Sequence, residues 1–409
     1  MYLMSHKKEI VRNIISFGSI DILGLLIPIV TMPILTRALG ASQYGIYMLL
    51  LTIFYFGHTI IDYGTQFTSV RELAKQRDNP EKVRLIYQST QGLRLCLCLL
   101  YVIVAISYSL FLSFDNAVLY MVLASSAYLF GYALTPLWFY QGIGAVNRAM
   151  TVSLVIKLFN LLVIVFAIKS PDDLAIVLAS LCIPMLLGGV YLSHFAFRRY
   201  HVGIPSLGRL GKSLHDGRDV FIGLLAPNFY NAIPTIALGS MYPPAEFANF
   251  AIATRLVSVI ITAQNVIAKA VYPVVAVLKS NQVNKLLTVN AVVSIIPSII
   301  VYYCGEWALS IFLGKNFTGV NDYLIVLCVG VIFVGLSNAV SQGYFLPNGY
   351  DKLYRNISLR VSFLSLLISI FMIYKLGILG GALATTTARV IFFAYYLLVY
   401  IKLYYKKVP

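Results

Sequence analysis

Apolar segments of membrane-spanning length follow one another along nearly the whole chain. Five long runs contain no Asp, Glu, Lys or Arg: 95–114, 116–147, 174–197, 220–245 and 323–350. A run of about 18 or more apolar residues is long enough to cross the hydrocarbon core of a bilayer as a helix. The pattern therefore predicts an all-α integral membrane protein with twelve spans, near 13–36, 44–68, 89–113, 117–141, 149–168, 174–197, 219–240, 246–272, 286–303, 322–346, 356–374 and 378–401.

Two sequence matches relate the first half of the chain to the second. LTRALGASQYGIY around Gly40 is similar to PTIALGSMYPPAEFANF around Gly239, and WFYQGIGAVNRAMTVSL from Trp138 is similar to YFLPNGYDKLYRNISL from Tyr344. The matches keep the same order, at an offset close to half the chain length. Six spans per half give both halves the same topology, so we expect two six-helix bundles related by a pseudo-two-fold axis along the membrane normal, with a central cavity.

The segment between the halves is rich in Arg, Gly and His and is expected to be a linker. The predicted division is an N-terminal bundle at 1–200, a cytoplasmic linker at 201–218 and a C-terminal bundle at 219–409. Within the linker, SLGRLGKS almost matches the phosphate-binding loop pattern G-x-x-x-x-G-K-S, but Ser206 occupies the first position. Because no strand is predicted before it, ATP binding is not predicted there.

The composition agrees with a membrane protein and sets its orientation. Hydrophobic residues make up 59% of the chain and charged residues 11%, against roughly 25% charged in a soluble domain. With the N-terminus inside, most Lys and Arg outside the spans fall in cytoplasmic segments, the exceptions being Arg37, Lys169, Lys315 and Lys375. The positive-inside rule then places both termini in the cytoplasm. This bias accounts for most of the net charge of +16, so no nucleic-acid partner is predicted.

Six basic residues lie inside predicted spans. A Lys or Arg at the bilayer centre costs about 2.5–3.5 kcal/mol on insertion scales, so such side chains should face the protein interior or extend to an interface. Arg94 and Arg360 are near span ends and are expected to extend to the interface. Lys157 and Arg389 are too deep for that. The remaining two belong to one face of the eighth span, made of Arg255, Ser258, Thr262, Asn265 and Lys269.

The helical spacing of this polar face predicts an aqueous cavity that attracts anions. Asn228 and Asn231 of the seventh span are further candidates for it. The interiors of the apolar spans contain only two acids, Asp21 and Asp62. These neutralise at most two bases as structural ion pairs, or one of them carries a proton for energy coupling. The surplus stays positive and favours anionic groups such as phosphate.

The stretch PILTRALGASQYGIY places one of the outer basic residues at the turn between the first two spans. Gly40 and Gly45 permit a tight reversal of the chain there. Arg37 has two open interpretations: it caps the carbonyl groups at its helix end, or it marks the periplasmic mouth of the cavity and receives phosphate late in transport.

Three segments carry a family resemblance: LTRALGASQYGIY, DYGTQFTSVRELAKQRDNPEKV and PLWFYQG. Over essentially its whole length the chain resembles Wzx-type O-antigen flippases of the multidrug/oligosaccharidyl-lipid/polysaccharide exporter superfamily. The resemblance implies a MATE-like fold and a bacterial inner-membrane location. It also implies that undecaprenyl-pyrophosphate-linked O-antigen repeat units, or a similar polysaccharide, are turned from the cytoplasmic to the periplasmic leaflet by alternating access through the cationic cavity.

The implied partners are the lipid-linked oligosaccharide, membrane lipids, a polysaccharide polymerase and a chain-length regulator. Translocation needs no covalent chemistry, so no enzyme activity, catalytic residue, metal or cofactor is predicted. Asp62 and Asp21 are the candidates for energy coupling. The candidates for binding substrate are Arg255, Lys269, Lys157, Arg389, Arg37, Asn265, Asn228 and Asn231.

Two other kinds of function stay open. The first is an exporter of another lipid or of drugs on the same fold, and a cationic drug would need the opposite charge balance in the cavity. The second is a non-transporting membrane scaffold or a membrane enzyme. A scaffold would not need cations along a buried helix face, and an enzyme should show clustered His or acids, whereas His58 and His194 lie apart from any such cluster.

Overall fold

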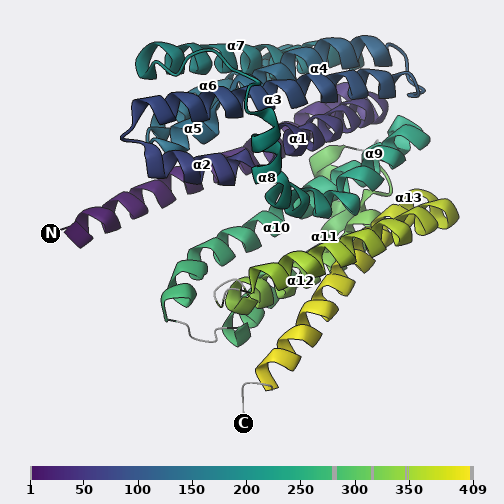
Figure 1. Ribbon diagram of the computed structural model, residues 1–409. Helices are drawn as coiled ribbons and strands as arrows, with labels where there is room; N and C mark the ends of the chain where they lie inside the picture. The colour runs from purple at the N-terminus through teal and green to yellow at the C-terminus, as the bar shows by residue number, and fades with distance from the viewer. Residues whose placement is uncertain (1, 279–282, 315–316, 346–347, 349, 406–409) are drawn as a thin grey trace. The chain divides into compact units, whose positions relative to one another are not determined.

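In the computed structural model, the described residues are 2–278, 283–314, 317–345, 348 and 350–405; the side chains of 2–26, 266–278, 342, 351, 404 and 405 fall outside the description. Every regular element within these residues is helical (Figure 1). Nine helices in this part of the chain are long and apolar enough to cross a membrane, or ten if one bent pair forms a single span. The all-helical, multi-pass fold predicted from the hydrophobic pattern is therefore confirmed.

The helices follow the chain in this order: α1 (Tyr2–Asp62), α2 (Thr65–Gln76), α3 (Pro80–Ser109), α4 (Ala117–Leu134), α5 (Leu137–Gly142), α6 (Val146–Ala167), η1 (Pro171–Asp173), α7 (Leu174–Tyr200), α8 (Leu210–Leu225), η2 (Ala226–Phe229), α9 (Ala232–Met241), α10 (Pro244–Leu278), α11 (Val283–Leu313), α12 (Val320–Val340), η3 (Ser341–Phe345) and α13 (Asp351–Tyr405). Of these, η1 and η2 are 3₁₀ turns and η3 is a π-helical turn.

Two helical segments are long enough to cross a bilayer twice. Ile27–Gln76, which joins the later part of α1 to α2, contains 50 residues, and Lys352–Leu403 of α13 contains 52. At about 1.5 Å per residue each exceeds twice the thickness of a hydrocarbon core of about 30 Å. Each is interrupted by a glycine with positive φ, Gly40 (φ 69°) in α1 and Gly377 (φ 61°) in α13. Both breaks lie where the sequence pattern predicts a turn between spans.

The predicted span 219–240 is the one that departs most from a straight helix. It consists of Leu210–Phe229 and Ala232–Met241, bent by 43°. Proline lacks the amide hydrogen that a helix needs, and Pro227 lies at the bend. Its carbonyl group accepts a hydrogen bond from Asn231 Nδ2 (3.0 Å). The helix also begins earlier than expected, because α8 starts inside the predicted linker.

The chain forms two compact units. The first contains residues 1–39 and 50–225, and the second contains 40–49 and 226–409. The short segment 40–49 belongs to the second unit, and Gly45 shows why it packs so closely there. A Cβ atom at Gly45 would lie 1.9 Å from the carbonyl oxygen of Pro244, so only glycine allows the two backbones this approach.

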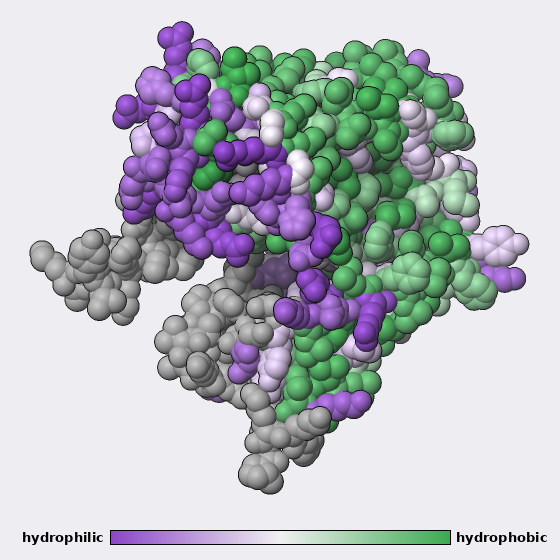
Figure 2. Space-filling view, viewed as in Figure 1, coloured by the Kyte–Doolittle hydropathy of each residue, from purple (hydrophilic) through white to green (hydrophobic). Residues whose placement is uncertain are grey.

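In the first unit, α4 packs against α3 and α7, and α6 packs against α7. The second part of α1 joins them, because the Tyr101 hydroxyl donates to the Ile53 carbonyl (2.7 Å) and Phe54 stacks on Tyr128. A buried aromatic cluster around Trp138 and Phe139 closes one end of this unit. Figure 2 shows hydrophobic residues over α4 and the later part of α3, as expected for helices in contact with lipid.

In the second unit, α12 packs against α10, α11 and α13. A buried aromatic cluster of this unit centres on Tyr344 and Phe345 of η3 and on Phe392 and Tyr396 of α13. The segments WFYQG and YFLPNG, which match each other in sequence, thus each place adjacent aromatic residues in the buried cluster of their own unit. Burial of these large side chains anchors the short, irregular element at the end of a long helix.

Candidate functional site: buried charges in each unit

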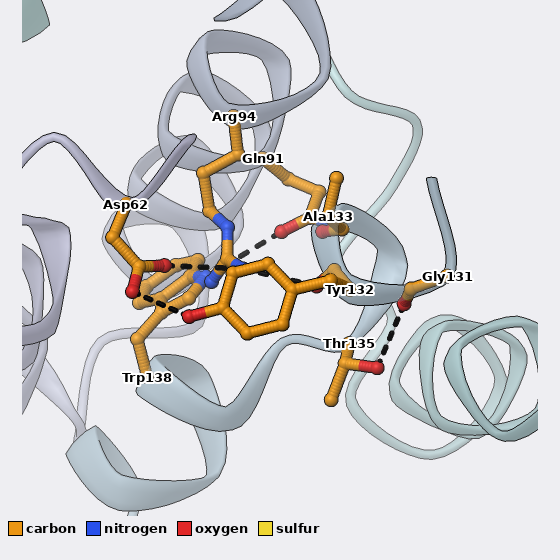
Figure 3. A network of polar contacts seen from close by, with 8 residues as sticks. All are labelled: Asp62, Gln91, Arg94, Gly131, Tyr132, Ala133, Thr135 and Trp138. Carbon is orange, nitrogen blue, oxygen red and sulfur yellow. Dashed lines mark hydrogen bonds and ion pairs between the residues drawn. The ribbon is translucent and has the colours of Figure 1, made fainter. Parts of the chain in front are cut away.

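The first unit contains a buried ion pair between Asp62, at the end of α1, and Arg94 in α3. Arg94 Nη2 lies 3.3 Å from Asp62 Oδ1, and the two side chains are 3% and 11% exposed. Figure 3 shows the guanidinium and the carboxylate pointing toward each other between their helices. The expectation that Arg94 extends to the membrane interface is therefore wrong. A buried partner of opposite charge stabilises the guanidinium more than a path to the interface would.

Tyr132 of α4 completes the environment of this pair. Its hydroxyl donates to Asp62 Oδ2 (2.6 Å), and its carbonyl group accepts a hydrogen bond from Arg94 Nη2 (3.1 Å). The guanidinium also lies over the Tyr132 ring, 5.4 Å from the centroid. The His58 ring stacks on the Tyr132 ring, with centroids 3.6 Å apart. Both carboxylate oxygens thus have partners, which lowers the cost of burying the charge.

The end of α4 explains why so many polar side chains gather here. The last four carbonyl groups of an α-helix have no partner within the helix, and α4 ends just before Pro136. All four accept hydrogen bonds from side chains: Gly131 from Thr135 (2.8 Å), Tyr132 from Arg94 (3.1 Å), Ala133 from Gln91 (2.6 Å) and Leu134 from Ser193 (2.5 Å). The network therefore satisfies a helix end that is buried inside the unit.

Gln91 links this helix end to α5. It is 1% exposed, and its Oε1 accepts a hydrogen bond from Trp138 Nε1 (3.4 Å). Sequence reasoning did not single out Gln91 or predict the pairing of Arg94 with Asp62. A usable signal was present: Gln91 and Arg94 lie three residues apart on one helical face, so a polar partner for that face was required.

The second unit buries an arginine in a different environment. Arg389 of α13 is 7% exposed, and its Nη1 lies 3.5 Å from the Leu327 carbonyl oxygen. Its aliphatic stem packs against α12 at Gly330, where a Cβ atom would lie 3.0 Å from Arg389 Cδ. Among the described residues, no carboxylate lies within ion-pair distance of this guanidinium. The arginine thus carries a buried charge that no described acid balances.

Polar and aromatic groups from the bent segment lie near Arg389. The Tyr230 ring packs on Phe392 with centroids 5.3 Å apart, and its hydroxyl is close enough to interact electrostatically with Arg389. The turn η2, which carries the half-buried Asn228, also packs against α13. Asn231 is exposed and binds the Pro227 carbonyl. The bent segment therefore brings Tyr230 near Arg389, while a contact between Arg389 and Asn228 or Asn231 stays a prediction.

Several side chains on the polar face of α10 already have hydrogen-bond partners, in α10 itself or in α12. The hydroxyls of Ser258 and Thr262 donate to the carbonyls of Arg255 and Ser258 (2.6 and 2.8 Å), and Asn265 Oδ1 accepts from Asn338 Nδ2 of α12 (3.0 Å). Arg255 is half-buried, and it interacts electrostatically with Tyr44 of the glycine-rich turn. The turn therefore contributes an aromatic hydroxyl that is within electrostatic range of this cation in the second unit.

The remaining candidates divide between the two units or fall outside the description. Lys157 is half-buried on α6 and Arg37 is exposed on α1, both in the first unit. The side chains of Asp21 and Lys269 lie outside the described residues. A polar face of α10 that continues from Arg255 to Lys269 therefore stays a prediction. Arg360 is exposed on α13, as expected for a side chain that reaches an interface.

Comparisons with known proteins give this arrangement a family. A family model described as "Polysaccharide biosynthesis protein" matches residues 10–279. The chain belongs to the polysaccharide biosynthesis protein family. Among its relatives is a Shigella dysenteriae protein named "Putative O-antigen transporter", 23% identical over 390 residues, which span 93% of this chain and 97% of the relative. An Escherichia coli K12 protein of the same name is 24% identical over 374 residues, 89% and 90% of the two chains.

Solved structures identify the fold of this polysaccharide biosynthesis family member. The lipid II flippase MurJ in an inward closed conformation matches with a TM-score of 0.75 at 14% identity, covering 94% of this chain and 87% of that one. An inward-facing multidrug resistance MATE family transporter of the MOP superfamily matches with a TM-score of 0.70 at 15% identity, covering 94% and 96%. The MATE-like fold expected from the sequence is confirmed.

Proposed function

We propose that this protein is a flippase for lipid-linked O-antigen or similar polysaccharide repeat units. The observation that carries the proposal is Arg389, a buried cation that no described carboxylate balances. An arginine in this position is costly unless an anion or a polar cavity compensates for it. A pyrophosphate group would supply that anion through charge-assisted hydrogen bonds. Membership of the polysaccharide biosynthesis family and relatives named as O-antigen transporters support this choice of substrate.

Translocation requires that the binding site opens to one side of the membrane and then to the other. Each chemical part of the substrate has a partner in the protein or in the lipid. The pyrophosphate is held by Arg389, with Arg255 and Lys269 of α10 as further cations. Asn228, Asn265 and the tyrosines of the second unit offer hydrogen bonds and ring faces to sugar. The prenyl chain stays in lipid. The two units then expose the bound head group first to the cytoplasmic and then to the periplasmic side.

The location and topology follow from the same proposal. The protein lies in the bacterial inner membrane with both termini in the cytoplasm, as the distribution of Lys and Arg predicts. Its partners are the lipid-linked oligosaccharide, membrane lipids, a polysaccharide polymerase and a chain-length regulator. The Arg94 ion pair supports a structural role for Asp62, which leaves Asp21 as the stronger candidate for coupling.

Substitution of Arg389 tests the proposal in cells that lack their own O-antigen flippase. Arg389→Gln should lower surface O-antigen at least tenfold, and Arg389→Lys should retain more because it keeps the charge. Arg360→Gln is the matched control, since it removes an exposed arginine from the same helix. Surface polysaccharide is measured on gels, and the amount of inserted protein by immunoblot. Normal export by a well-inserted Arg389→Gln protein would overturn the proposal.

A further inference from the structure

The first unit contains an open polar pocket that the proposed transport function does not use. About 510 Å³ of empty space, including solvent at the mouth, lies between the starts of α2 and α8 and the first half of α3. Hydroxyl and charged side chains dominate its lining, among them Thr65, Ser69, Thr90, Arg209 and Lys212. Figure 2 shows hydrophilic residues gathered on this side of the unit, over α2 and the beginning of α8.

The walls of the pocket are fixed by close backbone contacts. The Ser206 amide donates to the Gln88 carbonyl (2.9 Å), and a Cβ atom on Gly92 would lie 2.2 Å from the Ser206 carbonyl oxygen. These contacts hold the segment before α8 against α3. On the opposite side, Gly64 has a positive φ of 75° and lies against Val220 of α8. The pocket is therefore a built feature of the unit, held from both sides.

One buried group in the lining lacks a partner. Thr65, the first residue of α2, is 3% exposed, and its Oγ1 makes no hydrogen bond to any described residue. Its neighbours are satisfied, since Ser69 Oγ and Thr90 Oγ1 bond to each other at 3.0 Å. A buried hydroxyl without a partner costs about 1–3 kcal/mol. A ligand in the pocket that offers a hydrogen-bonding oxygen would remove this cost.

Two cations face the same space. Arg209 and Lys212 both line the pocket, and no carboxylate among the described residues lies within ion-pair distance of either. Both belong to SLGRLGKS, the stretch that resembles a phosphate-binding loop without its strand. The structure places α8 directly after Arg209, so the positive end of its helix dipole lies at the pocket. Cations, a helix start and hydroxyls together are the groups that bind phosphate.

Two acids in the lining restrict the kind of phosphate. Glu72 and Asp216 face the pocket as well, and a bare phosphate ion would be repelled by both. Carboxylates are strong acceptors for the hydroxyl groups of a sugar, as are the Thr and Ser side chains around them. A ligand that carries phosphate at one end and hydroxyl groups at the other satisfies both sets.

We propose that this pocket binds a phosphorylated hexose. Arg209 and Lys212 hold the phosphate, Thr65 donates to one of its oxygens, and Glu72 and Asp216 accept hydrogen bonds from the sugar. The ligand has two sources with this chemistry: a soluble sugar phosphate, or the head group of a lipid-linked saccharide before translocation. The proposal concerns binding at this pocket and stands apart from the role of Arg389.

Calorimetry on the purified full-length protein in nanodiscs tests the proposal. Glucose 1-phosphate is titrated in solution, with glucose and inorganic phosphate as comparisons, and undecaprenyl-phosphate-linked glucose is incorporated in the lipid in a parallel arm. We expect saturable binding of at least one of the two glucosyl phosphates, at least tenfold tighter than that of glucose or inorganic phosphate. Binding in only one arm identifies the source.

Variants separate a built site from general attraction of anions. Lys212→Gln and Thr65→Val should each weaken binding at least fivefold, and Lys212 is exposed enough that its replacement leaves the fold intact. Arg218→Gln, an exposed arginine of α8 outside the pocket, should leave binding unchanged. Arg389→Gln should also leave it unchanged, even where export is lost. The proposal is overturned if neither glucosyl phosphate binds, if inorganic phosphate binds equally well, or if Arg218→Gln weakens binding as much as Lys212→Gln.

Discussion

Among the described side chains, each unit of this protein buries one arginine between its helices, and the two arginines have opposite surroundings. Arg94 of the first unit has a carboxylate at 3.3 Å, a tyrosine ring and a backbone carbonyl around it. Arg389 of the second unit has a carbonyl oxygen at 3.5 Å and no carboxylate among the described residues. Their exposures are similarly small, 2% and 7%, so burial alone does not distinguish them.

The difference indicates two uses for a buried cation. A paired arginine that also caps a helix end holds helices together, and removing it leaves its acid uncompensated. An unbalanced arginine contributes little to folding, because its own desolvation cost opposes the packing of its stem. A ligand that binds later would compensate for such a residue. The comparison supports a structural role for Arg94 and is consistent with the proposal that Arg389 binds substrate.

Removal of each arginine in turn gives the largest expected contrast. Arg94→Met should lower the free energy of unfolding by about 3–5 kcal/mol, because Asp62 is left as a buried, unpaired charge. Arg389→Met should leave stability unchanged or raise it, since no described acid loses a partner. Unfolding of the purified proteins in detergent, followed by circular dichroism, measures both. Equal destabilisation by the two substitutions would contradict the comparison.

Removal of a tyrosine hydroxyl should also destabilise the first unit more than the second. Tyr132→Phe removes a hydrogen bond to a carboxylate and should cost about 1.5–3 kcal/mol. Tyr396→Phe removes a neutral contact with Ser358 Oγ (3.0 Å) and should cost about 0.5–1.5 kcal/mol. The same unfolding measurement ranks them. A greater loss for Tyr396→Phe would show that charge is not the source of the stability in the first network.

Replacement of the glycine at either helix break should lower stability by a similar amount, because both breaks depend on a positive φ. Gly40→Ala and Gly377→Ala each force a positive φ on a residue with a Cβ atom, at a cost of about 1–2 kcal/mol. Gly223 is the matched control, because it lies in α8 with open space around it. Gly223→Ala should stabilise by about 0.5–1 kcal/mol. Denaturation midpoints compare the three, and a stabilising Gly40→Ala would refute a strained break in α1.

Loss of an exposed ion pair should change stability least, and it provides the reference against which the loss of the buried Arg94 ion pair is compared. Arg218 Nε and Asp219 Oδ1 lie 3.9 Å apart, with side chains 63% and 66% exposed. Arg218→Gln should change stability by less than about 1 kcal/mol, because water screens the pair. If it destabilised the protein as strongly as Arg94→Met does, burial would not be the reason for the first unit's dependence on its ion pair.

Much of the fold could be predicted, whereas much of the candidate site could not. The glycines at 40 and 377 lie where the hydrophobic pattern ends one span and begins the next. The bend at Pro227 was missed because apolar content continues through it, and hydropathy does not register a broken hydrogen-bond ladder. Arg94 was assigned to the interface because its distance from the span end was the only information the sequence offered.

The sequence by itself determined which segments enter the membrane, since the transfer free energy of a long apolar segment depends on its own residues. It also determined the excess of bases over acids within the apolar segments and, with its short motifs, the family resemblance. Only the tertiary structure decided that Asp62 meets Arg94 and not Arg389, because partners from different helices are selected by packing. The same packing brought SLGRLGKS of the expected linker against Thr65, where hydroxyls and cations line one pocket.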